Sequence, residues 1–326
     1  MNHLLAALVA FLCLASPQAM AKTKFAVPPT IAFDAPSLYP EGVAYNADTK
    51  EFLVGSLHDG NIGSVSLDGK YRLWAKDARL VSTFGMKIDK PRNRLLVCVA
   101  DLGVGTKTIP ATRQKLAAVV SFDLDTGRVL AWYNLGSLPP GDHFANDLAV
   151  DDSGNIFVTD SLASLIYEID ASGRAFIAFT DPQFVPNRGK DAPGLGLNGI
   201  AAHPDGYLLV VKMDSGTLFK VDLKTHAISQ VALPKPLPGG DGLLLEGGDD
   251  LLVVQNEAGY VVKLHSADDW KSAKITGTTK VPLVFPTTMT MAEGKAYVLE
   301  ARLPELFDPK AAKSSAFAIH AVNLKP

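Results

Sequence analysis

The chain has little that would cross-link it, bind nucleic acid or cross a membrane. It contains 2 cysteines among 326 residues, and one of them, Cys13, lies in a segment that is typical of a leader. Its 31 Lys and Arg residues are balanced by 34 Asp and Glu residues and form no cluster, which argues against a nucleic-acid-binding surface. The hydrophobic content of 47% is too high for a disordered chain, so the composition indicates a globular protein.

The N-terminus has the features of a signal peptide. An apolar run at residues 3–16 is followed at residues 19–21 by Ala-Met-Ala, a small-x-small pattern typical of a signal-peptidase site. We predict a signal peptide at residues 1–21 and a secreted or periplasmic mature chain. A membrane anchor is the alternative, but the run is shorter than the roughly 20 residues that a bilayer requires. No later segment is apolar for long enough, so no membrane span is expected.

Cleavage at this site would leave Cys98 as the remaining cysteine. No intramolecular disulfide could then form. Cys98 lies in the apolar run at residues 95–99, where a lone thiol is usually a small buried hydrophobic side chain and not a nucleophile. We therefore expect the mature chain to be stabilised by its hydrophobic core, to which a metal ion could add.

A repeated unit runs through the rest of the chain. Each copy has a short apolar strand, a polar turn and a more strongly apolar strand. The copies lie at residues 40–55, 84–99, 145–160, 197–211, 240–254 and 286–299. Third and fourth strands follow most copies, joined by Asp-Gly, Thr-Gly or Ser-Gly turns that are typical of β-hairpins. Residues 22–326 thus divide into six units of about 51 residues, a length that suits a four-stranded propeller blade.

The predicted fold class is all-β, a six-bladed β-propeller in a single domain over residues 22–326. The last unit lacks a fourth strand, whereas an unassigned strand at residues 30–33 precedes the first unit. We predict that the early strand completes the last blade and closes the ring, so that no sheet edge stays free. A β-sandwich is the alternative, but six evenly spaced units fit it poorly. Helical turns are expected only near residues 266–271 and 304–313.

The residue that opens each unit is a candidate for function, because the innermost strands of all blades begin at one face of the central channel. These openers are Glu41, Gly85, Asn146, Asn198, Asp241 and Thr287. Four of them carry a carboxylate or amide oxygen, and two converging carboxylates would repel each other unless a cation lay between them. We predict that Glu41, Asn146, Asn198 and Asp241 bind a metal ion. Oxygen ligands that include neutral amides are typical of Ca²⁺, and the sequence leaves other divalent cations open.

Turn formation is the alternative explanation for three of these residues. Asn-Asp, Asn-Gly and Asp-Gly pairs form turns because Asn and Asp tolerate left-handed backbone geometry. Asn146, Asn198 and Asp241 could each be turn residues on this basis. Glu41 could not, since the Pro-Glu-Gly sequence around it has no turn-forming need for Glu. The matching positions of all four in their units favour the metal site.

On these residues the chain resembles the senescence marker protein, gluconolactonase and luciferin-regenerating-enzyme-like family, also called the calcium-dependent phosphotriesterase superfamily. The similar segments are PEG at Glu41, AND at Asn146, LNG at Asn198 and GDG at Asp241, and the resemblance spans the mature chain. It implies a six-bladed propeller, one catalytic divalent cation and hydrolysis of lactones or related esters. Members that act on sugar lactones carry an Arg where this chain has Phe144, so the resemblance does not extend to sugar recognition.

Loops at the same face as the predicted metal site form a mixed rim. We predict that His58, Phe144, Lys212 and Arg302 bind substrate, with Phe144 as an apolar wall and the other three as anchors. Pairing with neighbouring acids is the alternative for Lys212 and Arg302. His143 is a candidate proton carrier, for which a surface polar role is the alternative.

Together these patterns predict an exported hydrolase that depends on a divalent cation and acts on a small lactone or ester. The cation would act as a Lewis acid, and Asp241 would be the general base or the nucleophile. No G-x-S-x-G elbow or Cys-His pair points to serine or cysteine hydrolysis. The alternative is a non-catalytic, metal-stabilised propeller that serves as a binding or scaffold module. The substrate and the oligomeric state stay open.

Overall fold

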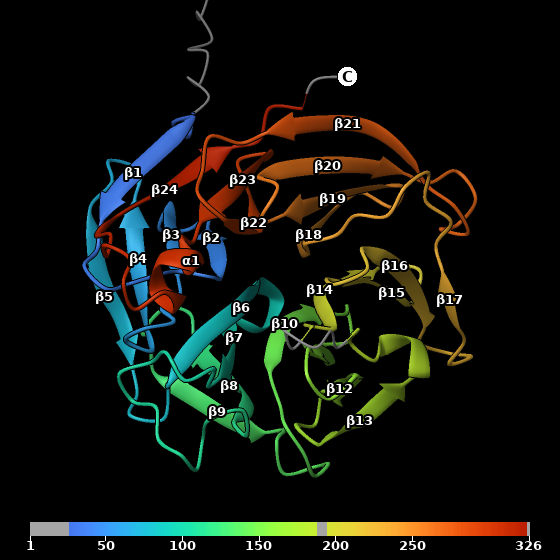
Figure 1. Cartoon of the computed structure of the whole chain (residues 1–326), viewed down its shortest axis with the longest axis horizontal. Helices are drawn as coiled ribbons and strands as arrows, with labels where there is room; N and C mark the ends of the chain where they lie inside the picture. Colours follow the sequence, from blue (N-terminus) through green and yellow to red (C-terminus); the bar gives the residue numbers. More distant parts are fainter. Residues whose placement is uncertain (1–25, 188–193, 325–326) are drawn as a thin grey trace, which may run out of the picture.

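The six sequence units fold into six four-stranded antiparallel sheets that stand in a ring around a central channel (Figure 1). The computed structural model describes residues 26–187 and 194–324. The predicted six-bladed β-propeller is thus confirmed. The predicted leader at residues 1–21 lies outside the described residues. Within the described ranges, no helix is long and apolar enough to span a bilayer.

The first five blades are each built from four consecutive strands, the first of which lies innermost. Blade 1 contains β2 (Val43–Asn46), β3 (Glu51–Val54), β4 (Asn61–Ser66) and β5 (Tyr71–Lys76). Blade 2 contains β6 (Ser82–Asp89), β7 (Arg94–Ala100), β8 (Ala117–Asp123) and β9 (Val129–Asn134). Blade 3 contains β10 (Ala145–Val150), β11 (Ile156–Asp160), β12 (Leu165–Ile169) and β13 (Ala175–Thr180).

Blades 4 and 5 repeat this order. Blade 4 contains β14 (Leu197–His203), β15 (Tyr207–Lys212), β16 (Thr217–Asp222) and β17 (Ile228–Gln230). Blade 5 contains β18 (Gly240–Glu246), β19 (Asp250–Gln255), β20 (Tyr260–His265) and β21 (Lys274–Lys280). Two short 3₁₀ turns lie in the connections, η1 (Lys90–Arg92) and η2 (Pro182–Phe184).

Blade 6 joins the two ends of the chain. It contains β22 (Pro286–Ala292), β23 (Lys295–Glu300), β24 (Ala316–Ala321) and β1 (Thr30–Asp34). Strands β1 and β24 are antiparallel, with Thr30 opposite His320 and Asp34 opposite Ala316, and they lie side by side in Figure 1. The early strand therefore closes the ring, as predicted.

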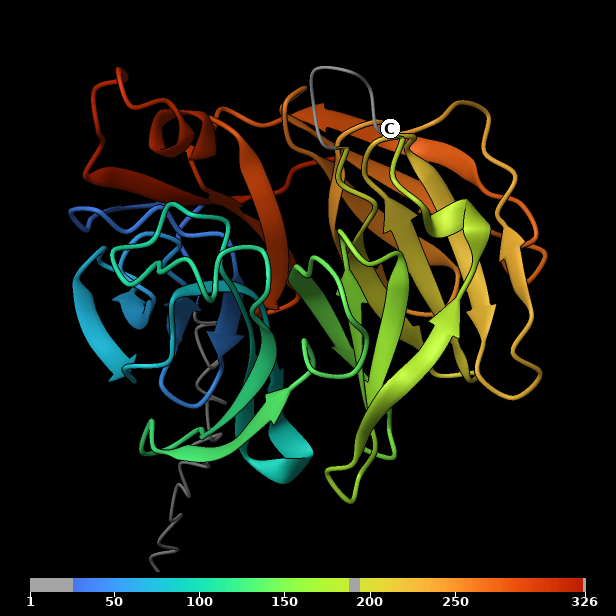
Figure 2. The same ribbon diagram turned by 60° about the horizontal axis from the view of Figure 1, so that its bottom comes forward.

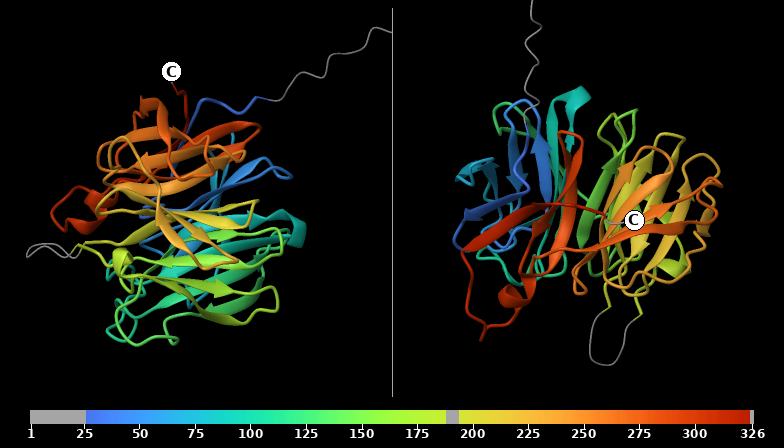
Figure 3. Two further views of the ribbon diagram at one scale, coloured as in Figure 1. Left: turned by 90° about the vertical axis from the view of Figure 1, so that its right-hand side faces the viewer. Right: turned by 90° about the horizontal axis from the view of Figure 1, so that it is seen from above.

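A short helix, α1 (Leu303–Phe307), lies between β23 and β24. It falls within the segment where the sequence allowed one helical turn, whereas residues 266–271 contain no helix. The side views show α1 standing out from one face of the ring (Figures 2 and 3). This helix marks the face at which the inner strands begin.

The core follows from the position of each strand in its blade. Inner and middle strands are covered by the neighbouring blades, so β7 buries six of its seven residues, among them Cys98. The outermost strand β9 has no buried residue, because one face of it meets water. The thiol of Cys98 is free and fully buried, as expected for a small hydrophobic side chain.

Candidate functional site

Five inner strands carry a β-bulge at their start. The register slips by one residue within each of the segments 83–86, 145–148, 197–200, 240–243 and 286–289. A bulge inserts an extra residue and redirects the side chains beside it. In each of these five blades the bulge contains the opener and the residue after it. The opener of blade 2 is therefore Phe84, and not Gly85 as the sequence pattern indicated.

The residue after each opener meets the inner strand of the next blade. A Cβ atom on Gly42 would lie 2.1 Å from the Phe84 carbonyl oxygen, and one on Gly199 would lie 2.2 Å from the Asp241 carbonyl oxygen. Glycine is needed at both positions because a Cβ atom would collide with the neighbouring strand. Neither residue has a positive φ, so a left-handed backbone is not the reason for glycine here. Asn198 and Asp241 also lack a positive φ and lie within strands. The turn explanation for them is therefore wrong.

The four predicted metal ligands lie together at one cavity in the channel. Each of these side chains, Glu41, Asn146, Asn198 and Asp241, is at most 4% exposed. Each has one oxygen without a hydrogen-bond partner in the structure: Glu41 Oε2, Asn146 Oδ1, Asn198 Oδ1 and Asp241 Oδ1. An unpartnered buried polar atom costs about 1–3 kcal/mol. Four such oxygens at one cavity form a donor set that fits a hard divalent cation.

Residues at the ends of the second strands orient three of these side chains. The hydrogen bonds run from Asn146 Nδ2 to Ser161 Oγ (2.9 Å), from Asn198 Nδ2 to Met213 Sδ (3.4 Å) and from Asn256 Nδ2 to Asp241 Oδ2 (3.1 Å). One polar atom of each of these three candidate ligands is thus held by a hydrogen bond, and its Oδ1 is left without a partner. Each pair is separated by 15 residues. This constant spacing is the signal that could have revealed these partners in the sequence.

Burial shifts the pKa of both carboxylates of the site upward, toward the protonated form. Burial raises the pKa of Asp241 to about 8, and the nearby charge of Asp147 contributes. Burial also raises the pKa of Glu41 well above its usual range, together with repulsion from Asp241 and Asp147. A cation bound here would have to displace protons from these carboxyl groups.

The donor set consists of oxygen atoms. Among residues 26–187 and 194–324, no group of three or more His, Cys, Asp or Glu side chains forms a cation site. The candidate site has two carboxylates, Glu41 and Asp241, and is completed by amide oxygens. Such a set suits Ca²⁺ better than Zn²⁺, which is usually bound by nitrogen and sulfur.

Apolar side chains form the wall of the same cavity, which has a volume of about 170 Å³. Phe144, predicted to bind substrate, is part of this wall and meets Phe84 edge-to-face with ring centroids 4.6 Å apart. The complete wall consists of Leu57, Phe84, Leu102, Phe144, Leu195, Met213, Phe285, Leu303, Pro304 and Phe307. Loops of several blades and helix α1 therefore converge over the four oxygens.

The other three residues predicted to bind substrate do not belong to the lining of this cavity. They contact neighbouring acids: His58 with Asp59 at 3.1 Å, Lys212 with Asp214 at 3.6 Å and Arg302 with Glu300 at 3.3 Å. For Lys212 and Arg302 these contacts match the alternative of charges paired with acids. Arg302 also pairs with Glu305 and thereby fixes the start of α1.

His143 is buried and is not a surface residue. Its Nδ1 lies 3.0 Å from Asp160 Oδ2, to which Tyr167 also donates a hydrogen bond. The hydrogen bond to Asp160 raises the pKa of His143, against the effect of burial. Asp160 in turn accepts a hydrogen bond from the backbone N–H of Phe144. This network supports the loop that carries Phe144, and His143 is absent from the cavity lining.

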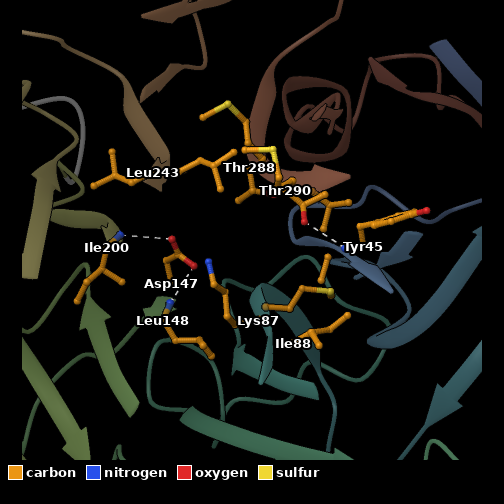
Figure 4. A pocket seen from close by; sticks show the side chains of 16 residues that line it. Tyr45, Lys87, Ile88, Asp147, Leu148, Ile200, Leu243, Thr288 and Thr290 are labelled. Carbon is orange, nitrogen blue, oxygen red and sulfur yellow. Dashed lines mark hydrogen bonds between the residues drawn. The ribbon is translucent and has the colours of Figure 1, made fainter. Parts of the chain in front are cut away.

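A second cavity, of about 240 Å³, lies further along the inner strands, toward the other end of the channel (Figure 4). Lys87 and Asp147 point toward each other at its edge. Asp147 accepts hydrogen bonds from the N–H groups of Leu148 (2.8 Å) and Ile200 (3.4 Å), and so links blades 3 and 4. Burial raises the pKa of Asp147 to about 6. None of the four candidate ligands lines this cavity.

No family model and no curated protein sequence matches the chain. Solved structures share its fold. The major allergen Mala s 1 of Malassezia sympodialis has a TM-score of 0.71 at 18% identity, over 91% of this chain and 97% of that one. A gluconolactonase from Xanthomonas campestris has 0.60 at 17%, over 90% and 88%. A luciferin-regenerating enzyme has 0.59 at 14%, over 91% and 97%. At these identities the similarity shows the fold alone.

Proposed function

We propose that the protein is an exported hydrolase that uses a divalent cation, Ca²⁺ as first choice, to cleave lactones or related esters. The proposal rests on the four unpartnered buried oxygens of Glu41, Asn146, Asn198 and Asp241 at one cavity. These residues would hold the cation. When bound, it would supply Lewis-acid stabilisation of the negative charge that develops on a carbonyl oxygen.

Asp241 is the residue that we assign to proton transfer. Asn256 holds its Oδ2, whereas its Oδ1 has no hydrogen-bond partner, and the residue lines the cavity. As general base it would take a proton from the attacking water and return it to the leaving alkoxide oxygen, giving an acid and an alcohol. The alternative role is nucleophile, in which Oδ1 itself attacks the carbonyl carbon. Apolar neighbours such as Phe84 and Phe144 would keep bulk water from the reacting groups.

One observation supports an enzyme of this kind, and another favours the second candidate. A gluconolactonase and a luciferin-regenerating enzyme share the fold. The export in this proposal rests on the leader predicted at residues 1–21. The second candidate is a metal-stabilised binding module. It is favoured by the cavity wall, which has no charged side chain that could orient a substrate for reaction.

The test is chelation combined with an Asp241→Asn substitution in the mature chain. We expect aryl-ester and lactone hydrolysis to stop on chelation and to return with Ca²⁺. Asp241→Asn should abolish turnover and keep some Ca²⁺ binding by calorimetry, because an amide oxygen can still ligate but cannot take a proton. Asp205→Asn, at an exposed carboxylate, is the matched control and should change neither turnover nor Ca²⁺ binding.

The outcomes separate the candidates. Hydrolysis that survives Asp241→Asn would remove Asp241 from its assigned role. A chain that binds Ca²⁺, loses melting temperature on chelation and hydrolyses no member of the panel would be the binding module.

A further inference from the structure

The lining of the candidate cavity consists of one small polar group of residues and a wall that is otherwise apolar. Its polar lining consists of the four candidate ligands and Asn256, whose amide is already bonded to Asp241 Oδ2 and to the Glu257 N–H. Every other lining residue is aliphatic, aromatic, Met or Pro. Away from the four oxygens, the side chains of this wall therefore have no strong donor or acceptor for a bound molecule.

At the rim of the cavity, apolar side chains are exposed to water. Phe307 belongs to the lining yet is 47% exposed, and Val284 beside the lining residue Phe285 is 44% exposed. The ion pairs of Arg302 with Glu300 and Glu305 hold the start of α1, so Phe307 stands on a fixed support. When a ligand covers an exposed aromatic residue in this position, the burial of apolar surface contributes favourably to the free energy of binding.

We infer that the substrate places an alkyl or aryl group against this wall while its carbonyl group faces the cation that the four oxygens would hold. The favoured substrates are esters or lactones with an apolar chain. Polyhydroxylated sugar lactones are disfavoured, because their hydroxyl groups would be buried without partners. The cleavage step rests on the proposed function, whereas the fit of an apolar chain to the wall does not.

The binding test uses alkan-2-ones of increasing length, which contain a carbonyl group but no bond to hydrolyse. Calorimetry with the Ca²⁺-treated mature chain should show affinity rising roughly fourfold per added methylene until the wall is covered. Phe307→Ser should reduce this increment for the longer ketones. Leu130→Ser is the control, since Leu130 is 48% exposed on the outer strand β9 and should leave the series unchanged.

Turnover of the matching esters, from acetate to octanoate, separates the two proposals. Affinity that rises with chain length without any hydrolysis would keep this inference and overturn the proposed function. Hydrolysis without a chain-length dependence, or equal hydrolysis of a polyhydroxylated lactone, would overturn the inference and keep the function. Equal effects of Phe307→Ser and Leu130→Ser would also overturn it.

Discussion

The acid pair of Glu41 and Asp241 combines two properties that seldom coexist, deep burial and a free oxygen on each side chain. Burial raises the pKa of both carboxyl groups, to about 8 for Asp241. At neutral pH the cation-free site therefore holds a proton on Asp241 that a cation must replace. Proton release and cation binding are then a single linked equilibrium.

This linkage predicts that Ca²⁺ affinity rises with pH. Protonated carboxyl groups compete with the cation, so affinity should increase as pH rises toward and through about 8. Without Ca²⁺ the stability of the fold should change with pH in the opposite direction. Folding raises the pKa of Asp241 from 3.8 to about 8, so the unfolding free energy should fall as pH increases between these two values. Calorimetry in buffers of different ionisation enthalpy measures the protons released, and a pH-independent affinity would contradict the prediction.

Individual residues differ in how far the sequence can predict them. Glu41, Asn146, Asn198 and Asp241 could be found because they occupy the same place in units that fold alike. For Lys212 and Arg302 the sequence left substrate binding and pairing with neighbouring acids both open, because a rim position alone does not distinguish a paired charge from a free one. The role of Asn256 becomes clear from its contact with Asp241, although its spacing of 15 residues from Asp241 recurs in the pairs of Asn146 and Asn198.

The inner strand is the element on which the site depends. In five blades a bulge redirects the opener, and the residue after the opener sets how closely the next blade approaches. Hydrophobic periodicity predicts such strands well but is insensitive to one inserted residue. For this reason the sequence pattern placed the opener of blade 2 at Gly85, whereas the bulge puts Phe84 in that position.

Gly199 gives a prediction at this scale. Its added Cβ would lie 2.2 Å from the Asp241 carbonyl oxygen, so Gly199→Ala should push blades 4 and 5 apart. We expect a loss of about 1–3 kcal/mol in the unfolding free energy, typical of overpacking, and weaker Ca²⁺ binding. Gly248→Ala is the control, because its Cβ would meet nothing closer than 3.3 Å. Urea unfolding and calorimetry measure the two effects, and equal results for both variants would refute this account.

The whole molecule is a ring whose stability depends on its closure. Six units of similar length predict six blades, and an unpaired early strand beside an incomplete last unit predicts where the ring closes. Both follow from the requirement that no sheet edge stays open. The loop arrangement over the channel could not be predicted in this way, because α1 and the longer loops do not repeat from unit to unit.

Phe33 on β1 provides the test of closure. Its ring lies 6.0 Å from that of Phe317 on β24 and 6.5 Å from that of Tyr71 on β5, so it joins blade 6 to blade 1. Phe33→Ala should lower the unfolding free energy by about 3–5 kcal/mol. Phe176→Ala, on the outer strand β13 of blade 3 and only half-buried, should cost clearly less. Denaturant unfolding measures both. A Phe33→Ala variant no less stable than Phe176→Ala would contradict this account, since a ring that closes through β1 must weaken when the aromatic contacts of Phe33 with blades 6 and 1 are removed.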